Sequence, residues 1–441
     1  MAVMADHCPG LDITVVDLNQ QRIDAWNNLG QLELPIYEPG LEEVLTRVRG
    51  TNRHFSTDVA DGIATADMVF LSVNTPTKTY GHGAGQAANL THIEAAARQI
   101  ATHAKGNTIV VERSTLPVRT AEALQAILAK GNGDHFDVLS NPEFMAEGTA
   151  IDDLQNPDRV LVGGQCSSAI EVLASIYGLW VSPDRIIRTN VWSAELSKLT
   201  ANAFLAQRVS SINTIAALCE KTGAKVHEVR QAIGSDHRIG INFLQPGPGF
   251  GGSCFKKDIL NLVYIAEHFG LQPVANYWRS VVELNEWNQH RIAQIINQKF
   301  FGTLRTKQIA VLGFAFKSDT NDVRESPAIA ICKELIQEGA TLAIHDPRAD
   351  ESDINSVLSN IDHIHDSNCY KFHRQLSNTL DGVDAVVILT DWNEYRKLDW
   401  STIAGQMNRP GWVFDTRGVV DLQDAAAHGL QTWLIGCGGH L

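Results

Sequence analysis

The chain has 441 residues, 44 % hydrophobic and 20 % charged, which suits two or three globular domains and argues against long disorder. The net charge of −14 argues against a nucleic-acid partner, because phosphate contacts need a basic surface. Seven cysteines without C-x-x-C spacing argue against a disulfide framework and give a metal site little support. No signal-peptide pattern and no run of 18 apolar residues occurs, so we expect a reduced, cytoplasmic protein without a membrane partner.

The first predicted strand covers residues 13–16, in LDITVVDLN, and ends at Asp17. An acid at the end of the second strand is typical of a dinucleotide-binding unit, in which a glycine-rich turn lies about 20 residues earlier. Only 16 residues precede Asp17 here, and the first ten contain one glycine. We therefore expect the sequence to lack the first strand and the phosphate loop of this unit, leaving an incomplete N-terminal sheet.

Further strands are predicted at residues 68–73, 108–111, 137–139 and 160–162, each ending near polar or turn residues. Runs that are apolar on both faces are typical of parallel sheets, which bind ligands beyond the carboxyl ends of their strands. This position makes Thr75, Thr115 and the segment SNPEFMAEGT candidates for a site. In that segment Glu143 or Glu147 could act as a general base, and equally both could be the acidic first turn of a helix.

A long helix is predicted next, from an N-cap at Ser193 to a C-terminal Gly223. About 28 residues of helix span roughly 40 Å, a length typical of a domain connector or a subunit interface. Lys198 and Asn202 lie four residues apart and so share one face of this helix. Together they could hold an oxyanion or polarise a carbonyl, whereas a solvated helix face is the ordinary alternative.

The segment PGPGFGGSCFKKD, residues 246–258, is the most informative stretch. Three of its glycines formally match G-x-G-x-x-G, but its prolines and the lack of a preceding strand rule out the dinucleotide motif. We predict instead a loop whose backbone approaches a ligand closely. Cys254 follows this loop with two lysines nearby, which favours a thiolate nucleophile over a small buried hydrophobic residue.

From Lys307 the α/β pattern restarts, with strands predicted in QIAVLGFAF, TLAIHDP, AVVILTD, WVFDTRG and QTWLIG. The expected fold class is therefore α/β, with two Rossmann-like parallel-sheet domains joined by a long central helix. The expected domains are residues 1–190, which carry the dinucleotide-binding pattern, residues 191–300, which are helical, and residues 301–441, which form the second α/β domain.

Six segments in order resemble the UDP-glucose/GDP-mannose dehydrogenase family: SVNTPTKTYG, ERSTLPVR, LSNPEFMAEGTA, ELSKLTANAF, PGPGFGGSCFKKD and GFAFKSDTNDVRESP. The likeness runs from about Met1 to about Gly436, nearly the whole chain. It implies NAD-dependent, four-electron oxidation of UDP-glucose to UDP-glucuronate through a cysteine thiohemiacetal and a thioester. It also implies a homo-oligomer, a dimer or larger.

The resemblance implies a role for each matching residue. Cys254 matches the nucleophile, Lys198 and Asn202 match the pair that stabilises oxyanion character at C6, and Asp258 matches a partner in water activation. Residues matching those around the catalytic water are Glu143 and Thr115. Residues matching cofactor contacts are Asp17, Arg22, Thr75, Thr115, Glu147 and Arg324. Residues matching substrate contacts are Glu143, Phe144, Glu147, Lys198, Asn202, Arg238, Phe250, Gly251, Phe255, Lys317 and Arg417, with Arg238 reaching the substrate of a neighbouring subunit.

Two departures from the family pattern leave alternatives open. Gln245 stands where many members have lysine, and the first strand with its glycine loop has no counterpart. A sister enzyme acting on GDP-mannose or a UDP-N-acetyl hexosamine is the close alternative, although Ser253 and NTPTKTYG favour UDP-glucose. More distant alternatives are a one-step hydroxyacid dehydrogenase and a nucleotide-sugar-binding subunit that is inactive because the phosphate loop is absent.

Overall fold

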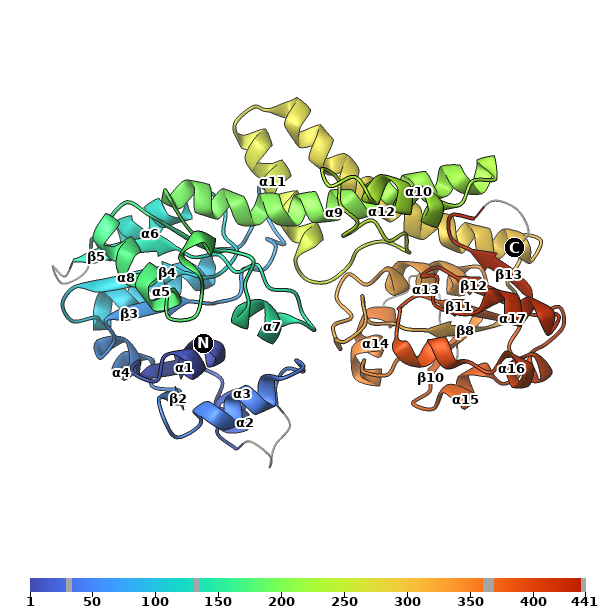
Figure 1. Ribbon diagram of the computed structural model, residues 1–441, viewed down its shortest axis with the longest axis horizontal. Coiled ribbons are helices and arrows are strands. Elements are labelled where there is room, and N and C mark those ends of the chain that lie inside the picture. Colours follow the sequence, from blue (N-terminus) through green and yellow to red (C-terminus); the bar gives the residue numbers. More distant parts are fainter. Residues whose placement is uncertain (29–33, 131–134, 360–368, 438–441) are drawn as a thin grey trace. The chain divides into compact units, whose positions relative to one another are not determined.

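The computed structural model describes residues 1–28, 34–130, 135–359 and 369–437 (Figure 1). The chain forms two compact units. Unit 1 comprises Met1–Ala201 and Leu260–Gln272, and unit 2 comprises Asn202–Ile259 and Pro273–Leu441. Each unit is built around its own parallel-sheet core.

Unit 1 contains two separate sheets. In the first, β1 (Ile13–Val16) pairs in parallel with β2 (Arg53–Ser56). The second has the order β3 (Met68–Leu71), β4 (Thr108–Glu112), β5 (Phe136–Ser140), β6 (Val160–Gly164) and β7 (Ile186–Thr189). A doubly wound sheet of order 3-2-1-4-5-6 has its first strand in the middle, and no strand among the described residues joins these two sheets.

The five-stranded sheet departs from the expected parallel pattern at one step. β5 pairs antiparallel with β6, with Leu139 opposite Gly164, while the other neighbours are parallel. Residues 141–159, which include α7 (Ala150–Gln155), connect these two antiparallel strands. Asn141, directly after β5, fixes this junction because its amide donates to the carbonyl of Leu161 at 2.8 Å.

Helices cover the sheets of unit 1 with apolar faces of 3.6-residue period. On α5 (Thr91–His103), Ile93, Ala97 and Ile100 are buried, and on α6 (Thr120–Leu128), Leu124 and Leu128 pack into the same core. The other helices of the unit are α1 (Ala2–His7), α2 (Gln20–Asn27), α3 (Leu41–Val48), α4 (Val59–Ala64) and α8 (Ser167–Tyr177).

The central helix, α9 (Val191–Thr222), is 32 residues long and contributes to both units. The prediction of Ser193 as its N-cap is wrong, because the helix begins earlier. The side chain of Asn190 accepts the N–H of Ser193 at 2.8 Å, which is the contact of an N-cap with the third helical residue. Gly223 ends the helix as predicted, with a φ of +81° that suits glycine.

Unit 2 combines helices with a six-stranded parallel sheet. The sheet order is β10 (Tyr370–Phe372), β9 (Thr341–His345), β8 (Gln308–Leu312), β11 (Ala385–Ile388), β12 (Trp412–Asp415) and β13 (Gln431–Leu434). The helices are α10 (Val226–Gly234), α11 (Phe255–His268), α12 (Gln272–Lys299), α13 (Pro327–Gln337), α14 (Glu351–Leu358), α15 (Leu376–Leu380), α16 (Trp400–Gln406) and α17 (Leu422–Ala427), of which α11 and α12 extend partly into unit 1. Buried clusters lie on both faces of the sheet, as a doubly wound fold requires.

Three strands were not predicted: β2, β7 and β10. They read RHFS, IIRT and YKF, and each has at least one exposed and one half-buried residue. Short, half-exposed strands at sheet edges lack the continuous apolar run that marks a buried parallel strand, so their sequences carry little signal.

Candidate active site

Unit 2 brings three of the predicted catalytic residues together. Cys254 immediately precedes α11, and its carbonyl accepts the N–H of Asp258 at 2.9 Å in the first turn. The side chain of Asp258 is 1 % exposed and accepts the amide N–H of Asn202 from α9 at 2.6 Å. This hydrogen bond joins α9 to the helix that begins at the candidate nucleophile.

The thiol of Cys254 is exposed, as a nucleophile requires. The two lysines expected to favour a thiolate are engaged elsewhere: Lys256 pairs with Glu286 and Glu325, at 3.1 and 3.2 Å, and Lys257 pairs with Asp258 at 3.0 Å. Both lysines therefore have carboxylate partners, and Cys254 itself lies at the N-terminus of α11, a position that favours negative charge.

Buried amides on α9 and α12 hold the loop before Cys254. Asn285 accepts the N–H of Phe250 at 2.8 Å and donates to its carbonyl at 3.1 Å. Asn213 accepts the N–H of Gly247 at 2.9 Å, and Asn288 donates to the carbonyl of Gly247 at 3.0 Å. Sequence reasoning missed these three asparagines, whose only signal is an amide at an otherwise core-facing position of a helix.

The glycines of this loop allow close packing against the loop that follows β8. A Cβ added to Gly251 would lie 2.5 Å from the carbonyl oxygen of Glu325 and 2.9 Å from the Cβ of Phe316. The N–H of Gly252 donates to the carbonyl of Arg324 at 2.8 Å. The loop that we predicted to approach a ligand closely is therefore packed against protein on this side. The rings of Phe250 and Phe255 contact each other edge to face, with 5.9 Å between their centroids.

Arg417 is a half-buried cation of unit 2 beside this loop. Its Nε donates to the carbonyl of Leu389 at 2.8 Å, and a Cβ on Gly247 would lie 3.2 Å from its Nη1. Burial lowers the pKa of the Arg417 guanidinium, against the opposing effect of Asp391 and Asp415. Gln245 donates to the carbonyl of Arg417 at 3.3 Å, so the residue that departs from the family pattern still lies beside a predicted substrate contact.

Asp415, at the end of β12, shapes the turn that carries Arg417. Its two oxygens accept the N–H groups of residues 417–420 at 2.7–2.9 Å. Desolvation by burial raises the pKa of Asp415, and the four backbone donors oppose this rise. The turn that presents Arg417 is therefore held by a buried carboxylate that sequence reasoning did not single out.

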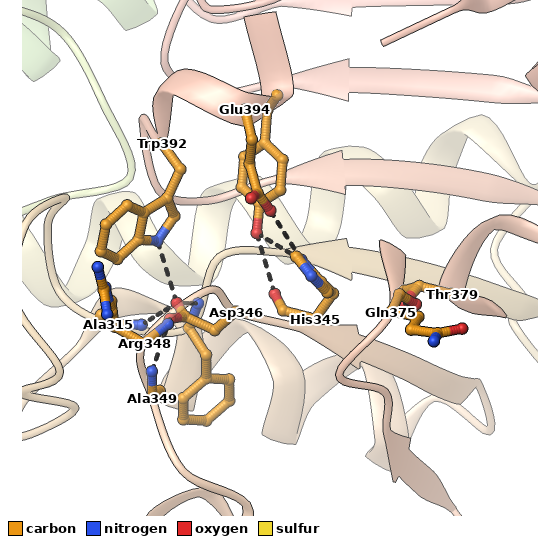
Figure 2. Close-up of polar contacts among 11 residues, drawn as sticks. Ala315, His345, Asp346, Arg348, Ala349, Gln375, Thr379, Trp392 and Glu394 are labelled. Atoms are coloured by element: carbon orange, nitrogen blue, oxygen red, sulfur yellow. Dashed lines mark hydrogen bonds and ion pairs between the residues drawn. The ribbon is translucent and has the colours of Figure 1, made fainter. Parts of the chain in front are cut away.

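Asp346, which follows β9, holds the loop after β8 in the same way, by accepting its backbone N–H groups (Figure 2). Its Oδ2 accepts the N–H groups of Phe314 and Ala315 and the indole N–H of Trp392, at 2.7, 2.9 and 3.2 Å. Its Oδ1 accepts two further backbone N–H groups, from residues 348 and 349. This acid ends the second strand of its sheet, where a ribose-binding acid stands in a dinucleotide site, but all its bonds go to protein. Lys317 lies in the same loop after β8 that Asp346 holds.

In unit 1 the polar ends of β3 and β4 meet as predicted. Thr75 donates to the carbonyl of Thr115 at 3.1 Å, which ties together two predicted cofactor contacts. Asp17, at the end of β1, lies 3.6 Å from Arg22, and both side chains are well exposed. Asp17 and the Thr75–Thr115 pair follow the carboxyl ends of parallel strands in two separate sheets, and such strand ends are where α/β sheets bind ligands.

Glu143 and Phe144 lie in a cavity of about 220 Å³ at the end of β5. Arg113 pairs with Glu143 at 3.2 Å and donates to Asn141 and Tyr177 at 2.6 and 2.9 Å. The α7 helix begins only at Ala150, so Glu143 does not belong to a helical first turn. Arg113 is a residue that sequence reasoning missed, although it directly follows a strand at its carboxyl end.

The ring of Phe144 lies between two cations. The guanidinium carbon of Arg159 lies 3.9 Å from the ring centroid, and the ammonium of Lys198 lies 5.5 Å from it. Lys198 therefore contacts the segment that contains Glu143, and Asn202 follows one turn later on α9.

Two other predicted contacts pair with carboxylates two residues away in the sequence. Arg238 is exposed and pairs with Asp236 at 2.6 Å, and Arg324 is exposed and pairs with Asp322 at 2.7 Å. Glu147 is half-buried in the loop before α7. Within the described residues, no group of three or more His, Cys, Asp and Glu side chains could hold a metal ion. None of the described helices has the length and apolar character needed to cross a bilayer.

Three family models cover most of the chain. They describe the NAD binding domain, the central domain and the UDP binding domain of the UDP-glucose/GDP-mannose dehydrogenase family, and match residues 1–181, 192–287 and 310–422. This chain belongs to that family. The match to the NAD binding domain and the geometry at Asp17, Thr75 and Thr115 fall in the same unit, and the UDP binding domain contains Lys317 and Arg417.

Individual members of the family are similar along almost the whole chain. UDP-glucose 6-dehydrogenase 3 of Oryza sativa subsp. japonica is 51 % identical, and UDP-glucose 6-dehydrogenase 1 of Arabidopsis thaliana is 50 % identical; each comparison covers 99 % of this chain and 94 % of the relative. A solved structure of a UDP-glucose dehydrogenase from Pyrobaculum islandicum superposes with a TM-score of 0.85 at 29 % identity, covering 99 % of this chain and 94 % of the other.

Proposed function

We propose that this chain oxidises UDP-glucose to UDP-glucuronate with NAD as the oxidant. The observation that carries the proposal is the junction of Asn202, Asp258 and Cys254: an exposed thiol at a helix N-terminus, one turn from a buried carboxylate bonded to a helix amide. The relatives at about half identity along the whole chain are named as UDP-glucose 6-dehydrogenases, which supports this substrate over a sister nucleotide sugar.

In the proposed reaction the Sγ of Cys254 adds to the aldehyde at C6, forms a C–S bond and gives a thiohemiacetal. NAD, when bound, accepts the hydride removed from C6 in each of the two oxidations. The second oxidation leaves a thioester, and water attacks its carbonyl, breaks the C–S bond and returns the proton to sulfur. Lys198 and Asn202 hold the oxygen at C6 while it carries negative charge, and Asp258 takes up a proton from water.

The residues present fit the adenosine end of NAD. Asp17 presents a half-exposed carboxylate beyond a parallel strand, as a ribose contact requires, and Arg22 lies beside it. Thr75 and Thr115, with Glu147 and Arg324, are proposed as further contacts along the cofactor. No glycine-rich turn joins a strand to a helix in residues 1–28 and 34–130, so we assign the pyrophosphate to no residue.

For the substrate, Arg417 and Lys317 supply the cations expected to bind a diphosphate. Phe250, Gly251 and Phe255 are proposed to line the sugar, and Glu143, Phe144 and Glu147 are proposed as further substrate contacts. With Thr115, Glu143 is also proposed to position the water that cleaves the thioester. The ion pair with Arg113, at 3.2 Å, supports this role because it fixes the position of the Glu143 side chain.

We further propose a homo-oligomer in which Arg238 reaches the substrate of a neighbouring subunit. Its exposure supports a contact outside its own unit, and exposed rings on α9 and α12 supply an apolar surface. The division into residues 1–190, 191–300 and 301–441 and a cytoplasmic location are proposals as well. The seven cysteines are thiols in the structure, which is compatible with a reducing compartment.

The test is the number of NADH formed per UDP-glucose consumed. Two NADH with UDP-glucuronate as product supports the proposal, whereas one NADH indicates a one-step dehydrogenase. No NADH while UDP-glucose still binds indicates a nucleotide-sugar-binding subunit. Faster turnover of GDP-mannose or a UDP-N-acetyl hexosamine than of UDP-glucose would assign the chain to a sister activity.

A further inference from the structure

Two glutamates meet in the interior of unit 1 without a role in the proposed chemistry. Glu112 is the last residue of β4, and Glu195 lies in the first turns of α9. They are 1 % and 3 % exposed, respectively. Burying two ionised carboxylates side by side is strongly unfavourable, so such a pair normally retains one proton.

Glu195 is placed to carry the negative charge. Its Oε2 accepts the N–H of Arg119 at 2.7 Å, and its Oε1 accepts the N–H of Ala121 at 2.9 Å. These are backbone donors at the start of α6, and a helix N-terminus stabilises an anion. Each carboxylate oxygen can accept a second hydrogen bond.

Glu112 is placed to carry the proton. Among the described residues neither of its oxygens has a hydrogen-bond partner, and Glu195 is the neighbouring carboxyl whose charge acts on it. Burial, and then the charge of Glu195, raise the pKa of Glu112 well above its ordinary value. An O–H of Glu112 that donates to Glu195 satisfies both groups.

The neighbouring strands supply Glu112 with no counter-charge. Its partners in register are Leu71 on β3 and Ser140 on β5. Arg113, the residue that follows β4, directs its guanidinium to Glu143.

The neighbouring helix does not supply a counter-charge either. On α6, Glu122 adds a second negative charge toward Glu195. The guanidinium of Arg119 is held by Glu122 at 3.3 Å, with both side chains well exposed. A shared proton is therefore the remaining way to relieve the repulsion between the two buried carboxyls.

We propose that Glu112 and Glu195 share one proton as a buried acid–carboxylate pair and that this pair positions Thr115 and Lys198. The positioning half of the proposal rests on the proposed function. Thr115 lies in the loop between Glu112 and Arg119, so the pair holds both ends of that loop. Lys198 follows Glu195 by three residues, nearly one turn of α9.

The first test is the pH dependence of stability in Glu112→Gln, whose amide still donates to Glu195 but cannot ionise. In the wild type, the raised pKa means that the folded chain binds a proton which the unfolded chain releases above its ordinary pKa of 4.5. The contribution of this proton to stability is complete below that value and is lost as pH rises toward the pKa of the folded state. We therefore expect the Tm of Glu112→Gln minus the Tm of the wild type to increase by about 2–4 °C or more between pH 5 and pH 9.

The matched control is Glu122→Gln, an exposed glutamate beside the same pair, which should follow the wild-type curve. Infrared spectroscopy of the wild type should show the C=O band of a protonated carboxyl near neutral pH, and that band should be absent in Glu112→Gln. Parallel Tm curves together with no such band would overturn the shared proton. Since neither measurement needs turnover, a failure here is distinct from a failure of the proposed function.

The second test addresses positioning. Glu195→Gln puts an amide N–H₂ against the backbone donors of α6, and we expect kcat to fall roughly 10- to 100-fold with little change in the KM for UDP-glucose. The wild-type kcat should decline on the alkaline side, where Glu112 ionises, and Glu112→Gln should lack that decline. Unchanged kcat in Glu195→Gln and identical pH profiles would overturn the positioning role even if the proton is shared.

Discussion

At Cys254 an accessible thiol lies at the N-terminus of a 14-residue helix, while the ammonium groups nearest to it in sequence are paired with carboxylates. We therefore expect any reactivity of Cys254 to come from its exposure and its place before α11 rather than from these lysines. Substitution of Cys254 is the most direct test of the proposed chemistry.

Cys254→Ser should abolish the four-electron oxidation. A serine hydroxyl forms a nucleophilic alkoxide far less readily than a cysteine thiol forms a thiolate, and the intermediate would have to be an ester instead of a thioester. We expect NADH production to fall by roughly 10³-fold or more. Mass spectrometry of wild type quenched during turnover should show a covalent adduct on Cys254 that the variant lacks. Cys166→Ser is the matched control, since Cys166 also precedes a helix but lies in unit 1, and it should retain activity. Normal turnover by Cys254→Ser would remove this thiol from the mechanism.

Three loops of unit 2 are held by buried polar side chains from neighbouring helices and strand ends. Three asparagines fix the loop before Cys254, Asp346 fixes the loop after β8, and Asp415 fixes the turn after β12. A buried side chain that hydrogen-bonds the backbone of a loop favours one loop conformation, because any other would leave those polar groups unpaired.

Gly249→Ala tests the first of these loops. Gly249 has a φ of +132°, and an added Cβ would lie 2.5 Å from the Oδ1 of Asn285. We expect a loss of about 1–3 kcal/mol in stability from backbone strain, and a larger relative loss of kcat because Cys254 follows the loop. Gly405→Ala on α16 is the control, with open space around the added Cβ, and it should be neutral or slightly stabilising. Thermal unfolding and turnover of both variants would show whether the loop conformation matters.

Asp346→Asn tests the second loop (Figure 2). The amide nitrogen would replace one acceptor oxygen, and leaving two buried N–H groups unpaired should cost about 2–6 kcal/mol. Asp350→Asn is the control, because the ion pair of Asp350 with Arg374 is exposed and should contribute less than about 1 kcal/mol. Chemical denaturation measures both, and calorimetry should show weaker binding of UDP to Asp346→Asn. Equal stability of the two variants would contradict the bracing role of Asp346.

Unit 2 exposes a group of neighbouring aromatic rings on α9 and α12. Phe204 of α9 and Tyr277 of α12 are 56 % and 53 % exposed, and both contact Trp278 at ring distances of 5.5 and 5.0 Å. Contiguous exposed rings of this kind are typical of a protein–protein interface.

We therefore expect the chain to be a dimer or larger in solution and Phe204→Glu with Tyr277→Glu to shift it toward monomer. Light scattering coupled to size-exclusion chromatography measures this. Phe301→Glu is the control, since Phe301 is 98 % exposed and lies beyond the end of α12, and it should leave the mass unchanged. A monomeric wild type, or an oligomer insensitive to the double substitution, would contradict this interface.

The sequence alone determined the α/β class, the long central helix and the segments that carry chemistry, because buried parallel strands and helix periodicity leave strong local patterns. The resemblance of six ordered segments also indicated the family. Edge strands such as β2, the antiparallel step between β5 and β6, and the start of α9 at Val191 escaped, because they depend on pairing and capping partners rather than on apolar runs.

Only the tertiary structure decided which polar groups meet. It joined Asn202 to Asp258 across 56 residues, engaged Lys256 and Lys257 with carboxylates, and buried Glu112 against Glu195. It also showed Asp346, which ends a strand as Asp17 does, to be committed to the backbone of its own unit, whereas Asp17 stays exposed. The physical reason is that hydrogen bonding and desolvation depend on the neighbours that folding brings together, and these are remote in the chain.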